Sequence, residues 1–234
     1  MIQNIKNIIR QIIHYPKLVL EETNYDDYWK DKRGDNLGFS NSWQKQRGDW
    51  IVDRIEEGST VLDIGCGDGG VLLYMKKKKD FQAMGADISD IVLNFLDSKG
   101  IEVVKFDIND FESIENLPEV DYVMILEVLE HIPNPEKFLN MIMKKTKKSL
   151  FFSFPNSGYI SYRLRLLFGA FPMQWRIHPG EHLRFWTYRD LKWWLKELKF
   201  DKKSEIHVYE GIPILNKLWK SLFGAAFIVK LEKD

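Results

Sequence analysis

A glycine-rich turn flanked by acidic residues is the part of the sequence best suited to bind a ligand. Residues 61–70 read VLDIGCGDGG, with Asp63 before the first glycine and Asp68 inside the turn. Glycines at the end of a strand let the backbone fold tightly and let a ligand approach the main chain. The glycines at 65, 67 and 70 also fit the G-x-G-x-x-G spacing of dinucleotide-binding folds. Two carboxylates at this turn would repel a pyrophosphate, however, and they favour a cationic ligand.

Two further acids follow the next apolar runs. Asp87 closes the run 82–87, where a carboxylate can accept hydrogen bonds from both hydroxyls of a ribose. Asp107 follows the run 101–106 and can accept a hydrogen bond from an adenine amino group. A nucleoside sulfonium cofactor that carries an ammonium group fits this set of carboxylates.

A second chemistry-bearing segment follows the apolar run 121–126. It reads EVLEHIP and contains Glu127, Glu130 and His131. If this segment begins a helical turn, the three side chains lie on one face at positions i, i+3 and i+4. Such a face can act as a base or hold a metal ion. His178 and His182 lie much later, in a stretch rich in aromatic and basic residues.

Short apolar runs alternate with helical patterns and would bring these acids to one edge of a sheet. The expected strands are 60–64, 82–87, 101–106, 121–126 and 149–154, and the expected helices are 71–79, one capped by Ser89 and one opened by Asn134 and Pro135. This alternation predicts βαβ units and a mainly parallel sheet.

The C-terminal third departs from the alternation of strands and helices. Thr187 and Asp190 resemble a capping box, which predicts a helix after them. The runs 204–209 and 226–231 follow as two strands without a full crossover helix between them, which predicts an antiparallel pair at the sheet edge.

The DIGCGDG loop, the acid at the end of the second run and the terminal strand pair together resemble the class I S-adenosylmethionine-dependent methyltransferases, over roughly residues 44–234. The resemblance implies an α/β, Rossmann-like sheet of seven strands in the order 3-2-1-4-5-7-6, with strand 7 antiparallel and helices on both faces. It implies S-adenosylmethionine as methyl donor and S-adenosylhomocysteine as product. The cofactor contacts expected from it are Arg47, Asp63, Gly65, Gly67, Asp87, Asp107, Ile108 and Leu126.

Each of these residues has an expected role. Asp63, Gly65 and Gly67 would hold the methionine moiety, Asp87 the ribose, and Asp107 with Ile108 the adenine. Arg47 aligns with an arginine that grips the cofactor carboxylate in ubiquinone-type O-methyltransferases. The alternatives are a solvated helix face for Arg47 and a bare tight turn for the loop.

The E-x-x-E-H segment with a distant histidine is similar to that of UbiG-type ubiquinone-biosynthesis O-methyltransferases and of small-RNA 2′-O-methyltransferases, where it binds a divalent cation beside the accepting hydroxyl. Such ligands suit metal-assisted deprotonation. In many other methyltransferases the histidine contacts substrate or acts as a base without metal, and a purely structural role is the third interpretation. We expect His131 first and His182 second to take the acceptor proton, with Glu127 and Glu130 beside them. Whether a metal ion binds at this segment stays open at this point.

The resemblance leaves two alternatives to a small-molecule O-methyltransferase. Residues 153–167 resemble MetW, a methyltransferase-like family that works with a homoserine acyltransferase, although the EVLEH segment departs from the MetW pattern. The chain would then be a cofactor-binding partner protein in methionine biosynthesis. A nicotinamide-dependent oxidoreductase is the third hypothesis.

Composition narrows the class of protein. The 234 residues carry 34 basic and 34 acidic side chains, so the formal net charge is zero and nucleic acid is not an expected partner. The apolar runs are too short for a transmembrane helix, and a signal peptide is not evident, so we expect a cytoplasmic protein. Cys66 is the sole cysteine, which excludes an internal disulfide.

We expect one methyltransferase domain over residues 1–234. Its parts would be an N-terminal helical cap (1–57), a cofactor-binding core (58–155), a substrate-lid insertion (156–186) and a last helix with the terminal strand pair (187–234). Isoleucines at 2, 5, 8, 9, 12 and 13 with Lys6, Arg10 and Lys17 could rest on an anionic membrane surface, or pack on the same domain or on a partner in a homodimer.

Overall fold

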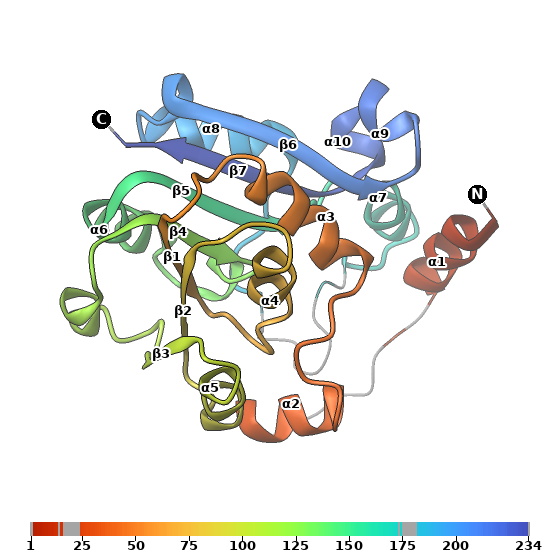
Figure 1. The fold of residues 1–234 in the computed structure, drawn as a ribbon. Coiled ribbons are helices and arrows are strands. Elements are labelled where there is room, and N and C mark those ends of the chain that lie inside the picture. Colours follow the sequence, from red (N-terminus) through yellow and green to blue (C-terminus); the bar gives the residue numbers. More distant parts are fainter. Residues whose placement is uncertain (1, 14, 16–23, 173, 175–181, 234) are drawn as a thin grey trace.

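The computed structural model describes residues 2–13, 15, 24–172, 174 and 182–233. Seven strands form one sheet in the order β3-β2-β1-β4-β5-β7-β6 (Figure 1). The strands are β1 (Thr60–Ile64), β2 (Gln82–Asp87), β3 (Glu102–Lys105), β4 (Val120–Leu126), β5 (Thr146–Pro155), β6 (Ser204–Gly211) and β7 (Gly224–Glu232). Neighbouring strands among β1 to β5 are parallel, whereas β7 runs antiparallel to both β5 and β6. The predicted Rossmann-like sheet, its strand order and its antiparallel last strand are confirmed.

Helices surround this sheet. They are α1 (Ile2–Ile13), α2 (Tyr25–Arg33), α3 (Ser42–Val52), α4 (Gly70–Lys76), α5 (Asp90–Asp97), α6 (Pro135–Lys145), α7 (Ile160–Leu167), α8 (Tyr188–Glu197), α9 (Leu215–Leu218) and α10 (Lys220–Phe223). Three short 3₁₀ turns add η1 (Glu112–Asn116), η2 (Leu129–His131) and η3 (Asp201–Lys203). Within the described part of the chain, no helix combines the length and the apolar character needed to cross a bilayer.

Alternation along the central strands gives the sheet two buried faces. In β4, Val123 and Ile125 pack into a core with α6 and α8, whereas Tyr122 and Met124 pack into a second core with α3, α4 and α5. Successive side chains of a strand point to opposite faces, so a strand that is apolar throughout needs helices on both sides.

The predicted helix starts are confirmed by their caps. The Ser89 hydroxyl accepts a hydrogen bond from the Val92 amide, Asn134 caps α6 with Pro135 behind it, and Thr187 forms a capping box with Asp190. Two predicted ends differ. The helix α4 stops at Lys76 instead of residue 79, and α6 gives way to β5 at Thr146, three residues before the expected strand 149–154.

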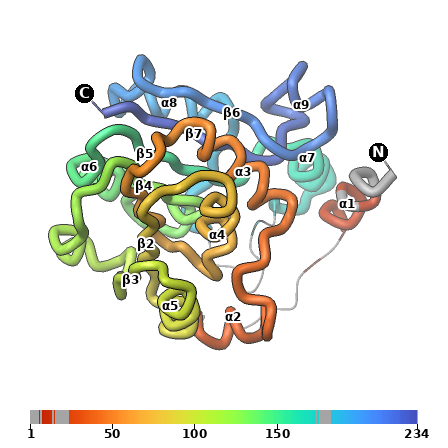
Figure 2. The backbone as a smooth tube through the Cα atoms, in the orientation of Figure 1, coloured from red at the N-terminus to blue at the C-terminus, as the bar shows by residue number. Residues whose placement is uncertain are grey.

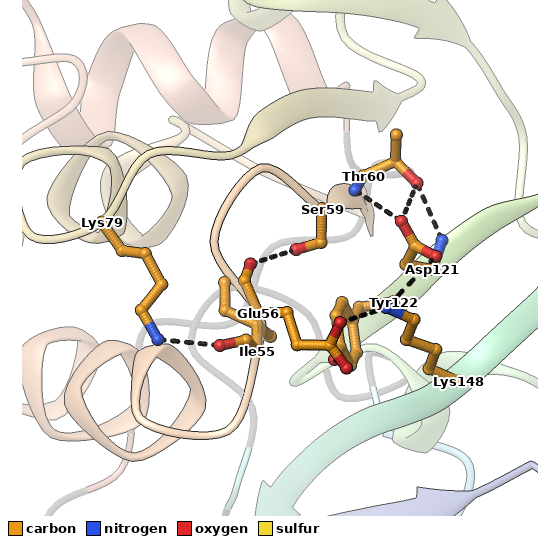
Figure 3. Close-up of polar contacts among 8 residues, drawn as sticks. All are labelled: Ile55, Glu56, Ser59, Thr60, Lys79, Asp121, Tyr122 and Lys148. Atoms are coloured by element: carbon orange, nitrogen blue, oxygen red, sulfur yellow. Dashed lines mark hydrogen bonds and ion pairs between the residues drawn. The ribbon is translucent and has the colours of Figure 1, made fainter.

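A polar clamp ties β1, β4 and β5 together at their amino ends, away from the glycine turn (Figure 3). The Asp121 carboxylate accepts hydrogen bonds from the amide and the hydroxyl of Thr60, at 2.9 and 3.0 Å. Lys148 forms an ion pair with Glu56, and Lys79 donates to the carbonyl of Ile55. The hydrogen bonds from Thr60 and the positive charges of Lys148 and Lys147 lower the pKa of Asp121. The acids of the clamp therefore have a structural role.

Two outer helices are joined by a buried arginine. Arg165 of α7 is 1% exposed and donates hydrogen bonds to the carbonyls of Gln11 and Ile12 at the end of α1, and to the carbonyl of Phe171. A cation on the terminal carbonyls of a helix also complements the helix dipole. Arg165 therefore anchors α1 against α7, two helices that lie next to each other at the right of Figure 1.

The helix α2 is held beside α5 in the same way (Figure 2). Its Asp26 carboxylate accepts hydrogen bonds from the Ser89 hydroxyl and the Ile91 amide, which are among the first groups of α5. An acid at a helix start satisfies amides that have no partner inside the helix. This contact places α2 over the carboxyl ends of β1 and β2.

Candidate active site

A cavity of about 530 Å³ lies at the carboxyl ends of the parallel strands. Every site residue predicted from the sequence lines it: Arg47, Asp63, Gly65, Gly67, Asp87, Asp107, Ile108, Leu126, Glu127, Glu130, His131 and His182. Open α/β sheets bind ligands at this edge because the strand order reverses there, here between β1 and β4. The sheet thus brings together residues separated by more than a hundred positions in the sequence.

The glycine loop is shaped by positive φ angles and by close neighbours. Gly65 and Gly67 have φ of 68° and 53°, and a Cβ atom at these positions would lie 2.5 Å from Val128 and 2.7 Å from Trp29. Asp87 fixes the same loop, since its carboxylate accepts hydrogen bonds from the amides of Gly67 (2.9 Å) and Ser89 (3.0 Å). Burial nevertheless raises the pKa of Asp87. The loop is therefore held open toward the cavity with a carboxylate behind it.

Asp63 is the buried acid at the end of β1. Burial raises the pKa of Asp63 to about 8, against the opposing effect of Arg47, and Asp87 adds to the rise. One of its carboxylate oxygens has no hydrogen-bond partner among the described residues. A buried carboxyl with an unused oxygen at a cavity wall is suited to meet a cationic group of a ligand.

Arg47 is buried, so the alternative of a solvated helix face is wrong. Its guanidinium lies 3.1 Å from a carboxylate oxygen of Glu127 and donates a hydrogen bond to the Ser153 hydroxyl at 3.3 Å. Tyr209 places its ring 5.9 Å below the guanidinium carbon. Arg47 therefore lines the cavity while already paired with an acid of the chain.

Glu127 lies outside the helical turn that was expected to contain it. Its φ is 58°, and the 3₁₀ turn η2 begins only at Leu129. The Glu127 carboxylate turns toward Arg47 and accepts hydrogen bonds from the Ser153 hydroxyl at 2.8 Å and the Tyr209 hydroxyl at 3.0 Å. The expectation that Glu127, Glu130 and His131 share one helical face is therefore wrong, because a left-handed residue breaks the turn before it starts.

Glu130, His131 and His182 do come together. One potential ligand atom from each lies within 4.8 Å of the others, and the two imidazole rings meet edge to face at 4.8 Å between centroids. Glu130 is 1% exposed, and among the described residues neither of its carboxylate oxygens, nor Nδ1 of His182, has a hydrogen-bond partner. His178 lies outside the described residues.

Burial disfavours the charged forms of Glu130 and His182. Burial and the neighbouring Glu127 raise the pKa of Glu130 well above its usual range. Burial, with the nearby His131, lowers the pKa of His182 to about 3. His182 is thus neutral at physiological pH, which is the form of imidazole that binds metal ions. One carboxyl group and two imidazoles in this arrangement fit a divalent cation such as Mn²⁺, Fe²⁺ or Zn²⁺.

The segment before α8 is fixed against this cluster. The amides of Leu183 and Arg184 donate hydrogen bonds to the carbonyl of Glu130, at 2.7 and 3.1 Å. The Arg184 guanidinium donates to the carbonyl of Pro133. These bonds explain how His182 reaches His131 from a part of the chain about fifty residues away.

The helices α2 and α3 place aromatic side chains at the cavity, beside the glycine loop. Tyr25, Tyr28 and Trp29 of α2 and Trp43 of α3 line the cavity together with the predicted cofactor residues. Asp68 forms an ion pair with Arg33 of α2 and accepts a hydrogen bond from the Gly70 amide. The charge of Asp68 is therefore compensated within the protein, and of the two loop carboxylates Asp63 is the one left for a cationic ligand.

The remaining wall contains residues that the sequence did not single out. Gln11 of α1, Arg33 of α2 and Gln174 line the cavity, and Tyr162 of α7 reaches it from the expected lid segment. Burial raises the pKa of Tyr162 to about 12, so its hydroxyl stays protonated as a donor. These residues were missed because the periodicity of a helix predicts which side chains are buried, but it does not predict which of them face a cavity.

Comparisons with known proteins agree with this geometry. A family model described as a methyltransferase domain (Methyltransf_23) matches residues 43–205. A solved structure of an S-adenosylmethionine-dependent methyltransferase from Archaeoglobus fulgidus superposes with a TM-score of 0.63 and 23% identity, covering 90% of this chain and all of the other. The chain belongs to the class I S-adenosylmethionine-dependent methyltransferases.

Two curated relatives match most of this chain but only a part of their own length. The mitochondrial ubiquinone biosynthesis O-methyltransferase of Candida albicans is 30% identical over 178 residues, which is 70% of this chain and 53% of that protein. The bifunctional methionine biosynthesis protein MetXA/MetW of Rhodopirellula baltica is 26% identical over 172 residues, 67% of this chain and 27% of that protein. The chain therefore matches between about a quarter and about half of the length of these two relatives.

Proposed function

We propose that this protein transfers the methyl group of S-adenosylmethionine to a hydroxyl oxygen of a small-molecule acceptor. The cofactor would lie along the carboxyl ends of β1 and β2. Asp87 would accept the ribose hydroxyls, Asp107 with Ile108 would contact the adenine, and Asp63 would face the ammonium group. Trp29 would close over the loop from α2, since it already contacts Gly67.

The observation that carries the proposal is the pair of imidazoles at the acceptor end. His131 and His182 meet at the lip after β4, beside the predicted methyl donor and inside a largely buried wall. An attacking hydroxyl must lose its proton, and a neutral imidazole in a water-poor site can accept it. The relative that is named an O-methyltransferase supports the same acceptor class.

The chemical step needs alignment and one proton acceptor. The acceptor oxygen forms a bond to the methyl carbon as the bond from carbon to sulfur breaks, and its electron pair stays on sulfur to give S-adenosylhomocysteine. The hydroxyl proton goes to an imidazole nitrogen of His131. Glu127 holds Arg47 and the β5 hydroxyl of Ser153 in place, and the Tyr162 hydroxyl, which is hydrogen-bonded with Gln174, would stay protonated at the cavity wall. Proximity and orientation supply most of the remaining acceleration.

The same cluster is the proposed site of a divalent cation. Glu130, His131 and His182 would hold it, because their potential ligand atoms lie within 4.8 Å of one another, and the Glu130 carboxyl oxygens and Nδ1 of His182 have no hydrogen-bond partner among the described residues. With the cation bound, His131 would be its ligand instead of the proton acceptor, and the cation would lower the pKa of the acceptor hydroxyl.

The test is a methyl-transfer assay with matched acceptors. The full chain is incubated with S-adenosylmethionine and with paired phenols, catechols, aliphatic alcohols and amines, each with EDTA or with added Mg²⁺ or Mn²⁺, and S-adenosylhomocysteine is quantified. We expect turnover with a hydroxyl acceptor and none with its amine counterpart. Turnover confined to amines would overturn the oxygen assignment. Turnover unchanged by EDTA, with no Mn²⁺ bound in a paramagnetic titration, would overturn the metal and leave His131 as a metal-free base.

One alternative rests on the match to the MetXA/MetW protein. In that case the chain would bind the cofactor and act through a homoserine acyltransferase. The alternative predicts S-adenosylhomocysteine binding, no turnover with any acceptor in the assay above, and a stoichiometric complex with the acyltransferase of the same organism.

The raised pKa of Asp63 predicts that cofactor binding releases a proton. With a pKa of about 8, Asp63 is mostly protonated at pH 7, and an ammonium group beside it favours the ionised form. Calorimetric titration of S-adenosylhomocysteine at pH 7 in phosphate and in Tris should therefore show release of up to about one proton. Asp63→Asn should abolish the difference between the two buffers. Equal heats in both buffers for the unmodified protein would contradict the assignment of Asp63.

The same residue affects stability in a defined direction. Because its pKa is raised in the folded state, the folded protein binds more protons than the unfolded chain between about pH 4 and pH 8. The contribution of Asp63 to stability is therefore fully present below about pH 4 and declines as the pH rises to about 8. Urea unfolding of Asp63→Asn at pH 5 and pH 8 should show a smaller loss over this range than the unmodified protein.

A further inference from the structure

Three segments at the outside of the fold are among the parts of the chain that contain no acidic residue. They are the helix α1 (Ile2–Ile13), residues 159–172 around α7, and residues 212–224 around α9 and α10. About one residue in seven of the whole chain is acidic, and the formal net charge is zero. Charge is therefore segregated, with these segments carrying lysines and arginines alone.

The three segments are neighbours in the fold. Arg165 of α7 donates hydrogen bonds to the last carbonyls of α1, and Arg163 of α7 donates one to the carbonyl of Ser221 in α10 at 3.3 Å. Figure 1 shows α1, α7, α9 and α10 gathered at one side of the molecule. We call these three segments the basic apolar face.

Large apolar side chains are exposed on this face. Leu167 and Phe168, which end α7, are each 75% exposed, and Phe171 follows them. The helix α1 exposes Ile9 and Ile13, and the α9 region exposes Ile214, Leu218 and Trp219. Exposed apolar residues that gather from three separate segments mark a surface that another phase or molecule covers.

Exposed cations are interleaved with these apolar groups. They are Lys6, Arg10, Arg163, Lys217 and Lys220. The nearby acid Glu210 accepts hydrogen bonds from the hydroxyl of Ser42 and the side-chain amide of Gln46, and its hydrogen bonds and ion pairs among the described residues include none of these cations. Lys17, which the sequence placed with this group, lies outside the described residues.

We propose that the basic apolar face docks on an anionic lipid membrane. Leucine, isoleucine and aromatic side chains enter the acyl boundary of a bilayer, while lysine and arginine meet the anionic headgroups. A second copy of the chain fits less well, because two such faces brought together would place cations against cations without an acid to compensate them.

The experiment measures binding of the full chain to vesicles by flotation, with phosphatidylcholine alone and with phosphatidylcholine plus phosphatidylglycerol, up to about 1 mM lipid. Two variants are compared. Leu167→Glu with Phe168→Glu changes the face, and Trp193→Glu on α8 is the matched control, since that tryptophan is also 62% exposed but lies in an acid-containing helix. Unchanged circular dichroism and S-adenosylhomocysteine affinity verify that both variants fold.

We expect the protein to bind anionic vesicles at least about tenfold more strongly than neutral ones, and we expect this binding to weaken at high salt. The double variant should bind anionic vesicles at least about tenfold more weakly than the unmodified protein. The control variant should bind them as the unmodified protein does. Absence of vesicle binding, equal binding by the double variant, or equal loss in the control would each overturn the proposal. A dimer that the double variant dissociates, in the absence of vesicle binding, would assign the face to self-association instead.

Discussion

Replacing Asp87 by alanine is expected to lower the affinity for S-adenosylhomocysteine by at least about a hundredfold. The carboxylate is proposed to accept both ribose hydroxyls, and hydrogen bonds to a charged group contribute about 1.5 to 3 kcal/mol each. It also holds the glycine loop through the amides of Gly67 and Ser89, so the variant loses both a contact and its support. Isothermal titration calorimetry measures the change directly.

Asp90→Ala is the matched control for this experiment. Asp90 is three residues away at the start of α5, pairs with Lys105 on the surface and is not among the residues lining the cavity. We expect its affinity to stay within about twofold of the unmodified protein, since an exposed ion pair contributes under about 1 kcal/mol. An unchanged affinity in Asp87→Ala would remove the ribose assignment.

Replacing His131 by alanine is expected to lower turnover by about a hundredfold to ten-thousandfold while leaving cofactor affinity unchanged. Positioned general bases contribute rate factors of this size. The loss should appear in kcat, because in the proposed mechanism the proton moves in the transition state, whereas the cofactor would be held by Asp63 and Asp87. Steady-state kinetics with the hydroxyl acceptor found in the assay measures it.

His207→Ala serves as the control for the loss of an imidazole. His207 lies on β6, stacks on Trp50 at 5.7 Å and does not line the cavity. Turnover by His131→Ala equal to that of His207→Ala would show that His131 takes no part in the reaction. A His131→Ala variant that loses cofactor binding instead would move this residue to the cofactor side of the site.

Much of the fold was predictable because its signals are local. Strands such as β1 are short apolar runs that end at an acid or a glycine, and helices such as α5 and α6 begin at side chains that cap them. The acids of the site were predictable for the same reason. A parallel sheet places the residues after successive strands at one edge, so position in the sequence determines position in the site.

Contacts between distant segments were not predictable in this way. The sequence indicated that Asp68 was available to a ligand, but Arg33, which lies 35 positions earlier, pairs with it. Glu127 was placed on a helical face on the condition that a helical turn begins there. The residue instead has a φ of 58°, and its carboxylate accepts hydrogen bonds from the hydroxyls of Ser153 and Tyr209. Such choices depend on partners that only the folded chain brings together.

The clamp at the amino ends of β1, β4 and β5 has a consequence for redesign. Because Thr60, Asp121 and Lys148 join these strands at the end opposite to the cavity, the cohesion of the central sheet does not depend on the residues that would select an acceptor. Libraries that vary Tyr159, Tyr162 and Gln174 should therefore yield a high fraction of folded proteins. Variants at these positions would then fail because they lose activity toward an acceptor, and not because the sheet unfolds.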